Sequence, residues 1–405
     1  MELCVKEQCT GCLSCFNICP KKAITISIDV EGFLRPNIEH DKCISCGLCE
    51  KACPILNEPQ RDRVALKLYG AWNKDNNLLK NSSSGGIFTT IAAQIINEGG
   101  MVFGAAYDDD FNVKHICVET LEELSRLRGS KYVQSAIGGA YREVLDTLKK
   151  GRKVFFTGTP CQVAGLYGYL GRRKYENLFT ADFLCHGTPS SKVFQSYKEW
   201  LEAKYGSKMV AYNFRSKHWG WNGWCLQADF ENGKVYYGKN NSDPFSQAFI
   251  REYVMRPCCY DCHYVGTKRF GDITMGDFWG YQMMKGEEDN HNKGVSIVIT
   301  NTRAGEQMFD IIQDKLFSYR RTVDDAKKIN WTLYTAFAAN EKRPEFWHDY
   351  EAKGWQYLVD SYLKPKPLNP VQKLQYAFGF DNPILKGSIK LAINMKRLIR
   401  KIVKR

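Results

Sequence analysis

The stretch CTGCLSCFNICP at residues 9–20 recurs as CISCGLCEKACP at residues 43–54. Each copy spaces four cysteines by two, two and three residues and ends in a proline. In ferredoxins with two 4Fe–4S clusters, the fourth cysteine of each run ligates the other cluster. The double match disfavours zinc and disulfides, and it predicts two crossed ligand sets. These sets are Cys9, Cys12, Cys15 and Cys53 for one cluster, and Cys43, Cys46, Cys49 and Cys19 for the other.

The bulk composition is that of a globular protein. The chain has 405 residues, of which 44% are hydrophobic and 25% are charged. It lacks a long uninterrupted apolar run and an N-terminal secretory pattern. Sixteen cysteines in such a chain favour metal ligation in a reducing compartment over disulfides. We therefore expect a cytoplasmic location.

The net charge of +13 is concentrated at the C-terminal end. Residues 364–405 contain eleven Lys and Arg and a single acid, Asp381, so no specific nucleic-acid partner is predicted for the body. Residues 384–405 have apolar residues at helical spacing opposite a basic face. Two interpretations stay open: a helix that contacts the inner membrane surface peripherally, or one packed back on its own domain.

The pattern predicts an α+β fold: a bacterial-type ferredoxin domain, a larger α/β domain and a helical, basic end. The expected boundaries are 1–57 for the ferredoxin domain, 64–300 for the α/β domain, 301–383 for a helical extension and 384–405 for the basic tail. Within the first domain, 23–28 and 33–38 are expected strands. In the second, apolar strands at 66–72, 101–107, 153–159, 178–185 and 294–300 alternate with helical patterns, and 224–238 is an expected hairpin.

Two loops of the α/β domain have the composition of ligand-binding turns. Residues 82–86 (SSSGG) and 157–161 (TGTPC) each lie between an expected strand and an expected helix, where backbone N–H groups can hold a phosphate or simply cap the helix. Four separated cysteines, Cys161, Cys185, Cys259 and Cys262, could close a third cluster, or could be buried structural cysteines. Cys258 competes with Cys259, which we prefer for its two-residue spacer. Cys4, Cys117 and Cys225 are interpreted as free structural thiols.

The order of motifs resembles a known family. The double cysteine run is followed by SSSGGIF, GSKYVQS, FTGTPCQVAGL, FLCHGTPS, FRSKHWGW, RPCCYDC and DITMGDFWG. This order, across roughly residues 1–300, is similar to that of the coenzyme F420 hydrogenase/dehydrogenase beta subunits. The resemblance implies an FAD-dependent oxidoreductase with a third 4Fe–4S cluster beside the flavin. It places the flavin at Ser84, Gly85, Gly86, Lys131, Tyr132, Gly158, Thr159 and Pro160, and the third cluster at Cys161, Cys185, Cys259 and Cys262.

A role for these groups follows from their electron chemistry. Clusters pass single electrons, and a flavin can hold one or two. The expected order is ferredoxin or another redox donor, the two N-terminal clusters, the third cluster, FAD and an organic substrate. His186, Lys217 and Asp277 are the candidate catalytic residues for proton delivery. Arg215, Lys217 and Arg256 are the alternative receivers of an anionic substrate group.

Two classes of function remain open on the sequence. The first is an enzyme that reduces coenzyme F420 or another small molecule, with polysaccharide biosynthesis as one setting that would suit the basic tail. The second is an electron-transfer subunit that feeds a partner enzyme and has no substrate of its own. Clusters and flavin fused on one chain favour the first class.

Overall fold

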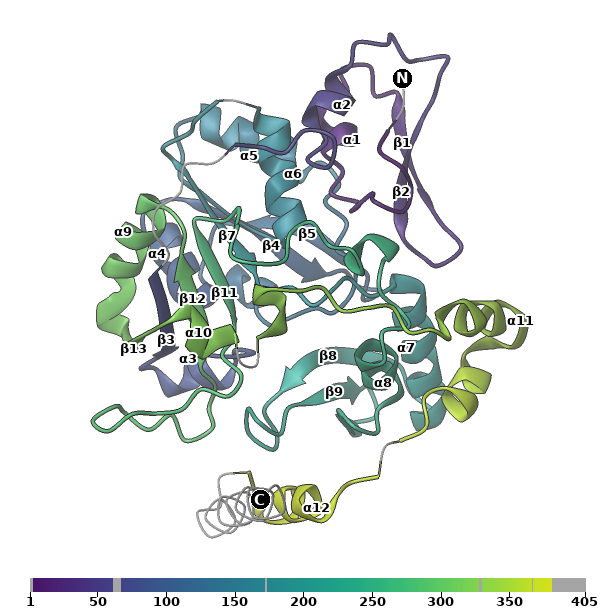
Figure 1. Cartoon of the computed structure of the whole chain (residues 1–405), viewed down its shortest axis with the longest axis vertical. Helices are drawn as coiled ribbons and strands as arrows, with labels where there is room; N and C mark the ends of the chain where they lie inside the picture. The colour runs from purple at the N-terminus through teal and green to yellow at the C-terminus, as the bar shows by residue number, and fades with distance from the viewer. Residues whose placement is uncertain (1–2, 61–66, 172, 328–329, 366, 381–405) are drawn as a thin grey trace, which may run out of the picture.

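The computed structural model describes residues 3–60, 67–171, 173–327, 330–365 and 367–380. Its largest element is a sheet of eight strands: β3 (Lys67–Asn73), β4 (Met101–Tyr107), β5 (Val113–Val118), β6 (Val154–Thr157), β7 (Leu178–Phe183), β11 (Ile273–Asp277), β12 (Ser296–Thr300) and β13 (Leu316–Arg321). They follow the order β13-β3-β12-β11-β7-β6-β4-β5 (Figure 1).

The middle of this sheet is parallel. β4, β6, β7 and β11 run in one direction, β5 pairs antiparallel with β4 at one side, and β12, β3 and β13 follow at the other side, each antiparallel to the strand before it. Because the carboxyl ends of parallel strands meet at one edge of a sheet, the loops that follow β6, β7 and β11 converge there. The TGTPC turn, Cys185 and Asp277 lie at or just after the ends of these three strands.

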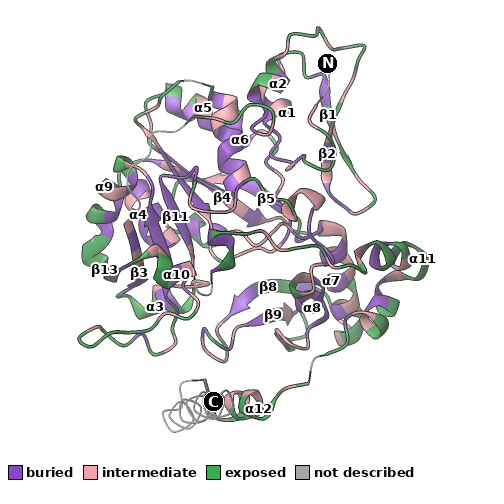
Figure 2. Cartoon of the chain, viewed as in Figure 1, coloured by how far each residue is buried: buried purple, intermediate pink, exposed green. Residues whose placement is uncertain are grey.

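Helices cover both faces of the large sheet, because successive strand residues point to opposite sides. Phe155 of β6 packs in one apolar cluster with Ile91 and Phe309, whereas its neighbour Phe156 packs in another with Val144 and Val163. The helices that supply these partners are α4 (Ile87–Asn97) and α9 (Arg303–Ile312) on one face, and α5 (Ala140–Lys149) and α6 (Pro160–Leu170) on the other. Figure 2 shows the buried strands between them.

A second, smaller sheet lies beside the first. It consists of β8 (Met209–Ser216), β9 (Cys225–Phe230) and β10 (Val235–Lys239), all antiparallel. An aromatic core that includes Phe194, Phe214 and Phe245 joins it to three helices, α7 (Ser191–Tyr205), α8 (Pro244–Ile250) and α11 (Arg343–Ser361). The shorter elements are α3 (Asn76–Lys80), α10 (Val323–Lys327), α12 (Pro370–Phe378), η1 (Glu123–Leu127), η2 (Pro257–Cys259), η3 (Gln313–Lys315) and η4 (Trp331–Leu333).

The N-terminal unit has the expected hairpin and two short helices. β1 (Ile24–Ile28) pairs with β2 (Leu34–Ile38), and α1 (Ser14–Ile18) and α2 (Leu48–Ala52) follow the second cysteine of each run. This unit packs on α6 through two glycines. A Cβ on Gly168 would lie 2.2 Å from the carbonyl oxygen of Ala52, and a Cβ on Gly165 would lie 2.8 Å from Cβ of Cys12. The absence of side chains at these positions allows the close approach.

The predicted combination of a ferredoxin unit and a larger α/β unit is confirmed. The elements after residue 300 differ from the expectation of helices alone, since β13 pairs with β3 at the sheet edge. The predicted basic tail at 384–405 lies outside the described residues. In the part of the chain that the structure describes, no helix has both the length and the apolarity needed to cross a membrane.

Candidate functional site

The eight cysteines of the two runs surround two cavities. The inner cysteine set, Cys9, Cys12, Cys15 and Cys53, lines one cavity beside α6. The outer cysteine set, Cys19, Cys43, Cys46 and Cys49, lines another. The fold therefore places Cys53 with the first three cysteines of the first run, and Cys19 with the first three cysteines of the second run, as the repeat predicted. Burial raises the pKa of Cys12 to about 12, so a thiolate there needs a compensating positive charge, as iron would supply.

Cys4 belongs to the same neighbourhood. The chain turns back between Val5 and Cys9, whose backbone N–H donates to the Val5 carbonyl at 3.0 Å. This turn places Cys4 in the lining of the inner cavity, together with Cys9 and Cys53. Cys4, which we interpreted as a free structural thiol, therefore lies beside the inner cysteine set. The spacing to Cys9 lies outside the repeated motif, so the sequence held no signal for this contact.

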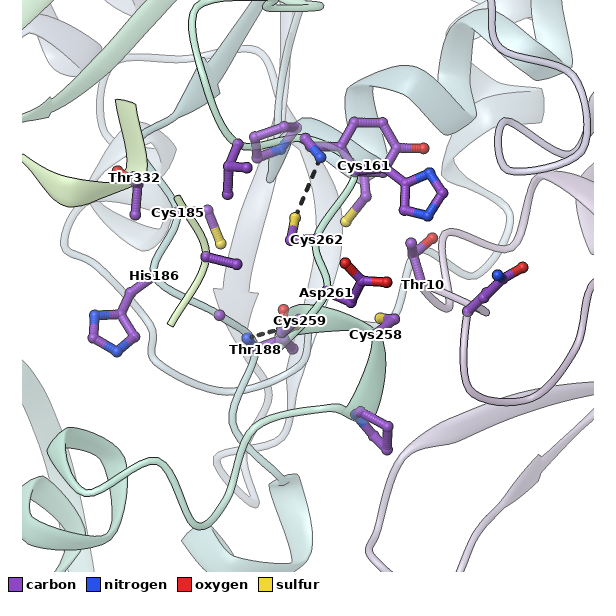
Figure 3. Close-up of a pocket in the computed structure, with 18 of the residues that line it drawn as sticks. Thr10, Cys161, Cys185, His186, Thr188, Cys258, Cys259, Asp261, Cys262 and Thr332 are labelled. Carbon is purple, nitrogen blue, oxygen red and sulfur yellow. Dashed lines mark hydrogen bonds between the residues drawn. The ribbon is translucent and has the colours of Figure 1, made fainter. Parts of the chain in front are cut away.

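The third cysteine set, Cys161, Cys185, Cys259 and Cys262, lines a cavity of about 270 Å³ (Figure 3). Cys161 is at the start of α6, Cys185 follows β7, and the other two are in and after η2. Cys258 lines the same cavity. The Thr188 N–H donates to Sγ of Cys259 at 3.4 Å, and the Tyr264 N–H donates to Sγ of Cys262 at 3.4 Å.

The chemistry of this donor set fits an iron–sulfur cluster. Cluster thiolates are typically stabilised by N–H···S bonds of the kind that Cys259 and Cys262 accept. Among the described residues, no group of three or more His, Cys, Asp or Glu is arranged to hold a single metal ion. A single ion needs its sulfur ligands about 2.3 Å from one point, whereas a cubane spreads four thiolates over four iron corners.

A larger cavity of about 540 Å³ adjoins the third cysteine set. Cys161, Cys185, His186 and Thr188 line both cavities, and Thr10 of the ferredoxin unit reaches both. Of the residues predicted to bind a flavin, Ser84, Gly86, Lys131, Tyr132, Gly158 and Thr159 line the large cavity. Pro160 lines the cavity of the third cysteine set instead. Gly85 is not among the residues that line either cavity, and it lies against Ala71 and Ser296 of the sheet.

One end of the large cavity is the start of α4. Gly86, at the N-cap with φ of +82°, has no side chain that could cap the helix, and Ile87, Phe88 and Thr89 of the first turn line the cavity. Free N–H groups and the helix dipole favour an anion at this point. Gly85 fits against the sheet, because a Cβ there would lie 2.3 Å from the Ala71 carbonyl oxygen. The residues present therefore fit the diphosphate of an FAD.

The two lysines of the prediction are held by backbone carbonyls. The Lys217 ammonium donates to the carbonyls of Leu79 at 2.7 Å and Ser84 at 2.8 Å, and the Lys131 ammonium donates to that of Arg128 at 2.9 Å. Burial lowers the pKa of each to about 7. Lys217 lies under the SSSGG loop and does not line the large cavity, so its contacts position the loop.

Asp277 and His186 occupy different parts of the large cavity. Asp277 accepts two hydrogen bonds from Arg215, at 2.6 and 3.2 Å, and one from the indole N–H of Trp221 at 2.7 Å. Arg215 is therefore paired with Asp277, and it also lines the large cavity. His186 Nε2 lies 2.6 Å from a carboxylate oxygen of Glu252, and its ring stacks on Phe337 with centroids 3.7 Å apart.

Two functional features were not predicted correctly from the sequence. Arg256 was expected as a possible receiver of an anion, but its side chain is fully buried and bound to backbone carbonyls of the ferredoxin unit. His115 was overlooked, although it lines the large cavity. Its ring nitrogens contact the Ser135 hydroxyl at 2.7 Å and the Thr157 carbonyl at 3.0 Å. No sequence signal marked His115, because β5 mixes polar and apolar residues.

The comparisons with known proteins agree with this arrangement. Residues 8–56 match the 4Fe-4S dicluster domain family. Residues 68–140 and 151–325 match the N-terminal and C-terminal parts, respectively, of the coenzyme F420 hydrogenase/dehydrogenase beta subunit. A subunit of the F(420)H(2) dehydrogenase of Methanosarcina mazei is 23% identical over 330 residues, which are 78% of this chain and 85% of that protein.

Two further relatives were found. The PorD subunit of the pyruvate synthase of Thermotoga maritima is 39% identical over 49 residues, which are 12% of this chain and 46% of that protein. A solved chain of the F420-reducing [NiFe] hydrogenase complex from Methanosarcina barkeri aligns with a TM-score of 0.45 and 21% identity, over 76% of this chain and 96% of its own length.

The ferredoxin unit and the matched families define an iron–sulfur electron-transfer protein of the oxidoreductase class. The chain belongs to the family of coenzyme F420 hydrogenase/dehydrogenase beta subunits, with a 4Fe–4S dicluster ferredoxin domain at its N-terminal end.

Proposed function

We propose that the protein is an iron–sulfur flavoenzyme that passes electrons from a ferredoxin-type donor to an organic acceptor. The observation that carries this proposal is the continuity of the large cavity with the third cysteine set, through Cys161, Cys185 and His186. FAD in the large cavity would convert single electrons into the pair that an organic acceptor needs. The start of α4 would hold its diphosphate, and the ring would face the third cysteine set.

The positions of the three cysteine sets support electron flow from the outer set through the inner set to the third set. The outer set includes Cys46, which is exposed, and Ile44 beside it is 58% exposed. The inner set lies against α6, because Cys12 packs on Gly165 of that helix. Gly165 is one helical turn after Cys161 of the third set. A donor protein can therefore approach the outer set, while the inner set faces the third.

His186 is the residue best placed to handle a proton at the cavity. It lines both cavities, and the carboxylate of Glu252, 2.6 Å from Nε2, fixes the orientation of its ring. Asp277 is committed to Arg215 and Trp221, so we assign it a positioning role. Lys217 positions the SSSGG loop.

The acceptor in this proposal is coenzyme F420 or another small molecule, which the rest of the cavity would admit.

A second candidate function is an electron-transfer subunit that feeds a partner enzyme. It is favoured by the similarity, over 78% of this chain, to a protein described as a dehydrogenase subunit. A partner would add the acceptor site, and purified protein alone would then reduce none of the small molecules offered.

The proposal is tested by following flavin reduction by a reduced ferredoxin in anaerobic protein. The test variant is Cys161→Ser, and the control is Cys117→Ser, which alters a cysteine of β5 that lines neither cavity. We expect the flavin of the control to be reduced as in the wild type, and that of the test variant to be reduced at least about tenfold more slowly. Equal flavin reduction in both variants would contradict the proposed connection.

A further inference from the structure

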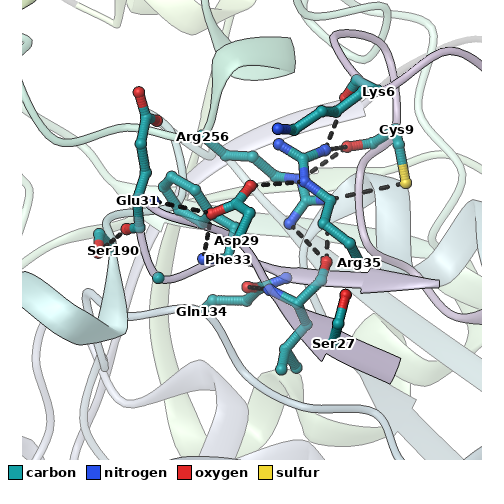
Figure 4. Close-up of polar contacts among 12 residues, drawn as sticks. Lys6, Cys9, Ser27, Asp29, Glu31, Phe33, Arg35, Gln134, Ser190 and Arg256 are labelled. Carbon is teal, nitrogen blue, oxygen red and sulfur yellow. Dashed lines mark hydrogen bonds and ion pairs between the residues drawn. The ribbon is translucent and has the colours of Figure 1, made fainter. Parts of the chain in front are cut away.

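Arg256 joins the ferredoxin unit to the loop of the third cysteine set. It directly precedes η2, which contains Cys258 and Cys259, and its side chain is fully buried. Its Nε donates to the Cys9 carbonyl at 2.6 Å, and both terminal nitrogens donate to the Leu34 carbonyl at 3.1 Å (Figure 4). One terminal nitrogen also donates to Sγ of Cys9 at 3.6 Å.

The charge of Arg256 has no carboxylate of its own. The nearby Asp29 accepts from Arg35 at 2.7 Å, as Figure 4 shows, and within the described ranges no ion pair of Arg256 is found. A buried positive charge is costly unless an anion compensates for it. The anion within reach is the thiolate of Cys9, together with the cluster that the inner cysteine set would hold. Phe33, with its ring centroid 5.5 Å from the guanidinium, shields the site from water.

We propose, building on the proposed function, that Arg256 tunes the inner cluster and couples it to the third. Its charge and its N–H···S bond favour the reduced, more negative state of the cluster at Cys9, which raises that cluster's reduction potential. The same residue gives a short connection from Cys9 through its side chain to its own backbone carbonyl, which accepts from the Cys259 N–H at 2.9 Å. One electron leaves the cluster at Cys9 and one arrives at the cluster of Cys259; no bond forms or breaks, and Arg256 keeps its proton.

A clamp with no electronic role is the alternative, and the chain offers a matched control for it. Arg343 also ties the ferredoxin hairpin to this region, because it donates to the Glu31 carboxylate at 2.9 Å and to the Met255 carbonyl at 3.0 Å. Within the part of the chain that the structure describes, none of its hydrogen bonds or ion pairs goes to a cysteine. Loss of either arginine weakens the contact between the two units, but only the loss of Arg256 removes a charge from Cys9.

The test is a redox titration of the anaerobic protein, followed by the electron paramagnetic resonance of its clusters. In Arg256→Gln we expect one midpoint potential to fall, so that the ratio of reduced to oxidised cluster at a fixed potential drops at least about tenfold, or about 59 mV for one electron. In Arg343→Gln all midpoint potentials stay at their wild-type values. Wild-type potentials in an iron-loaded Arg256→Gln protein, or an equal shift in Arg343→Gln, would overturn the proposal.

If the glutamine variant does not retain iron, the same midpoint potential is measured in Arg256→Lys. Lysine keeps the charge but cannot reach both carbonyls and the sulfur at once. An intermediate fall in the same midpoint potential is expected, and wild-type potentials in the lysine variant would overturn the proposal. A protein with about eight irons and no flavin would refute the proposed function instead, while the effect of Arg256 on the inner cluster would remain measurable.

Discussion

Replacement of Gly85 by alanine is a direct perturbation of the loop that we expect to hold the flavin diphosphate. A Cβ at this position would lie 2.3 Å from the Ala71 carbonyl oxygen and 2.8 Å from the Ser296 backbone nitrogen. These atoms belong to β3 and β12, which are paired with each other in the sheet. No side-chain rotation relieves such a contact, so the loop must move away from the sheet by about 1 Å.

The magnitude follows from the cost of overpacking. Insertion of one methyl group into a packed site costs about 1–3 kcal/mol. If the loop takes up most of this strain when it binds the diphosphate, FAD binding weakens by about tenfold to about a hundredfold. Because the atoms that a Cβ on Gly85 would meet belong to β3 and β12 and not to the N-terminal unit, we expect the iron content of that unit to be unchanged.

The assay is the equilibrium dissociation constant for FAD, measured anaerobically, together with the melting temperature and the iron content. Gly139→Ala is the matched control, since Gly139 has an ordinary φ of −90° and its Cβ would meet nothing within 4 Å. It should bind FAD as the wild type does. If Gly85→Ala binds FAD with wild-type affinity, the SSSGG loop does not hold the flavin.

Three further outcomes are expected. Burial lowers the pKa of His115 from 6.5 to about 4, so the unfolded state binds a proton more tightly than the folded state. The free energy of unfolding should therefore fall by up to about 3 kcal/mol more in the wild type than in His115→Gln as the pH drops from about 6.5 to about 4, and parallel curves from chemical denaturation at each pH would contradict this. Cys259→Ser should lose about four irons per chain whereas Cys258→Ser keeps them, and the reverse pattern in an iron assay would transfer the ligand role to Cys258. Asp277→Asn should lower the free energy of unfolding by about 3 kcal/mol, because it leaves Arg215 buried without a counter-charge; an unchanged urea midpoint would show that the pair contributes nothing.

Local patterns predicted the elements that form through contacts near in sequence. The hairpin expected at 23–28 and 33–38 is found as β1 and β2, and the helix after SSSGG is α4. β5, β8, β11 and β13 were not predicted, because their residues mix polar and apolar types. β11 and β13 also gain strand partners from remote parts of the chain, β7 and β3 respectively. The sheet, not the local pattern, decides their conformation.

The candidate site, too, was predicted only where its residues follow a local pattern. The repeat predicted which cysteines face a common cavity, because cluster ligation restricts the spacing. The contact of Arg256 with Cys9 joins residues 247 positions apart, and the carbonyls that hold Lys217 come from three separate segments. Such long-range contacts leave no periodic signal, so these side chains could be mistaken for groups that face a substrate.

The amounts of iron, sulfide and flavin per chain test our proposal that this one chain holds three clusters and a flavin. Protein purified without oxygen should contain about twelve irons and about one FAD. About eight irons with no flavin would contradict the claim, and would leave a ferredoxin domain attached to an α/β unit with another role.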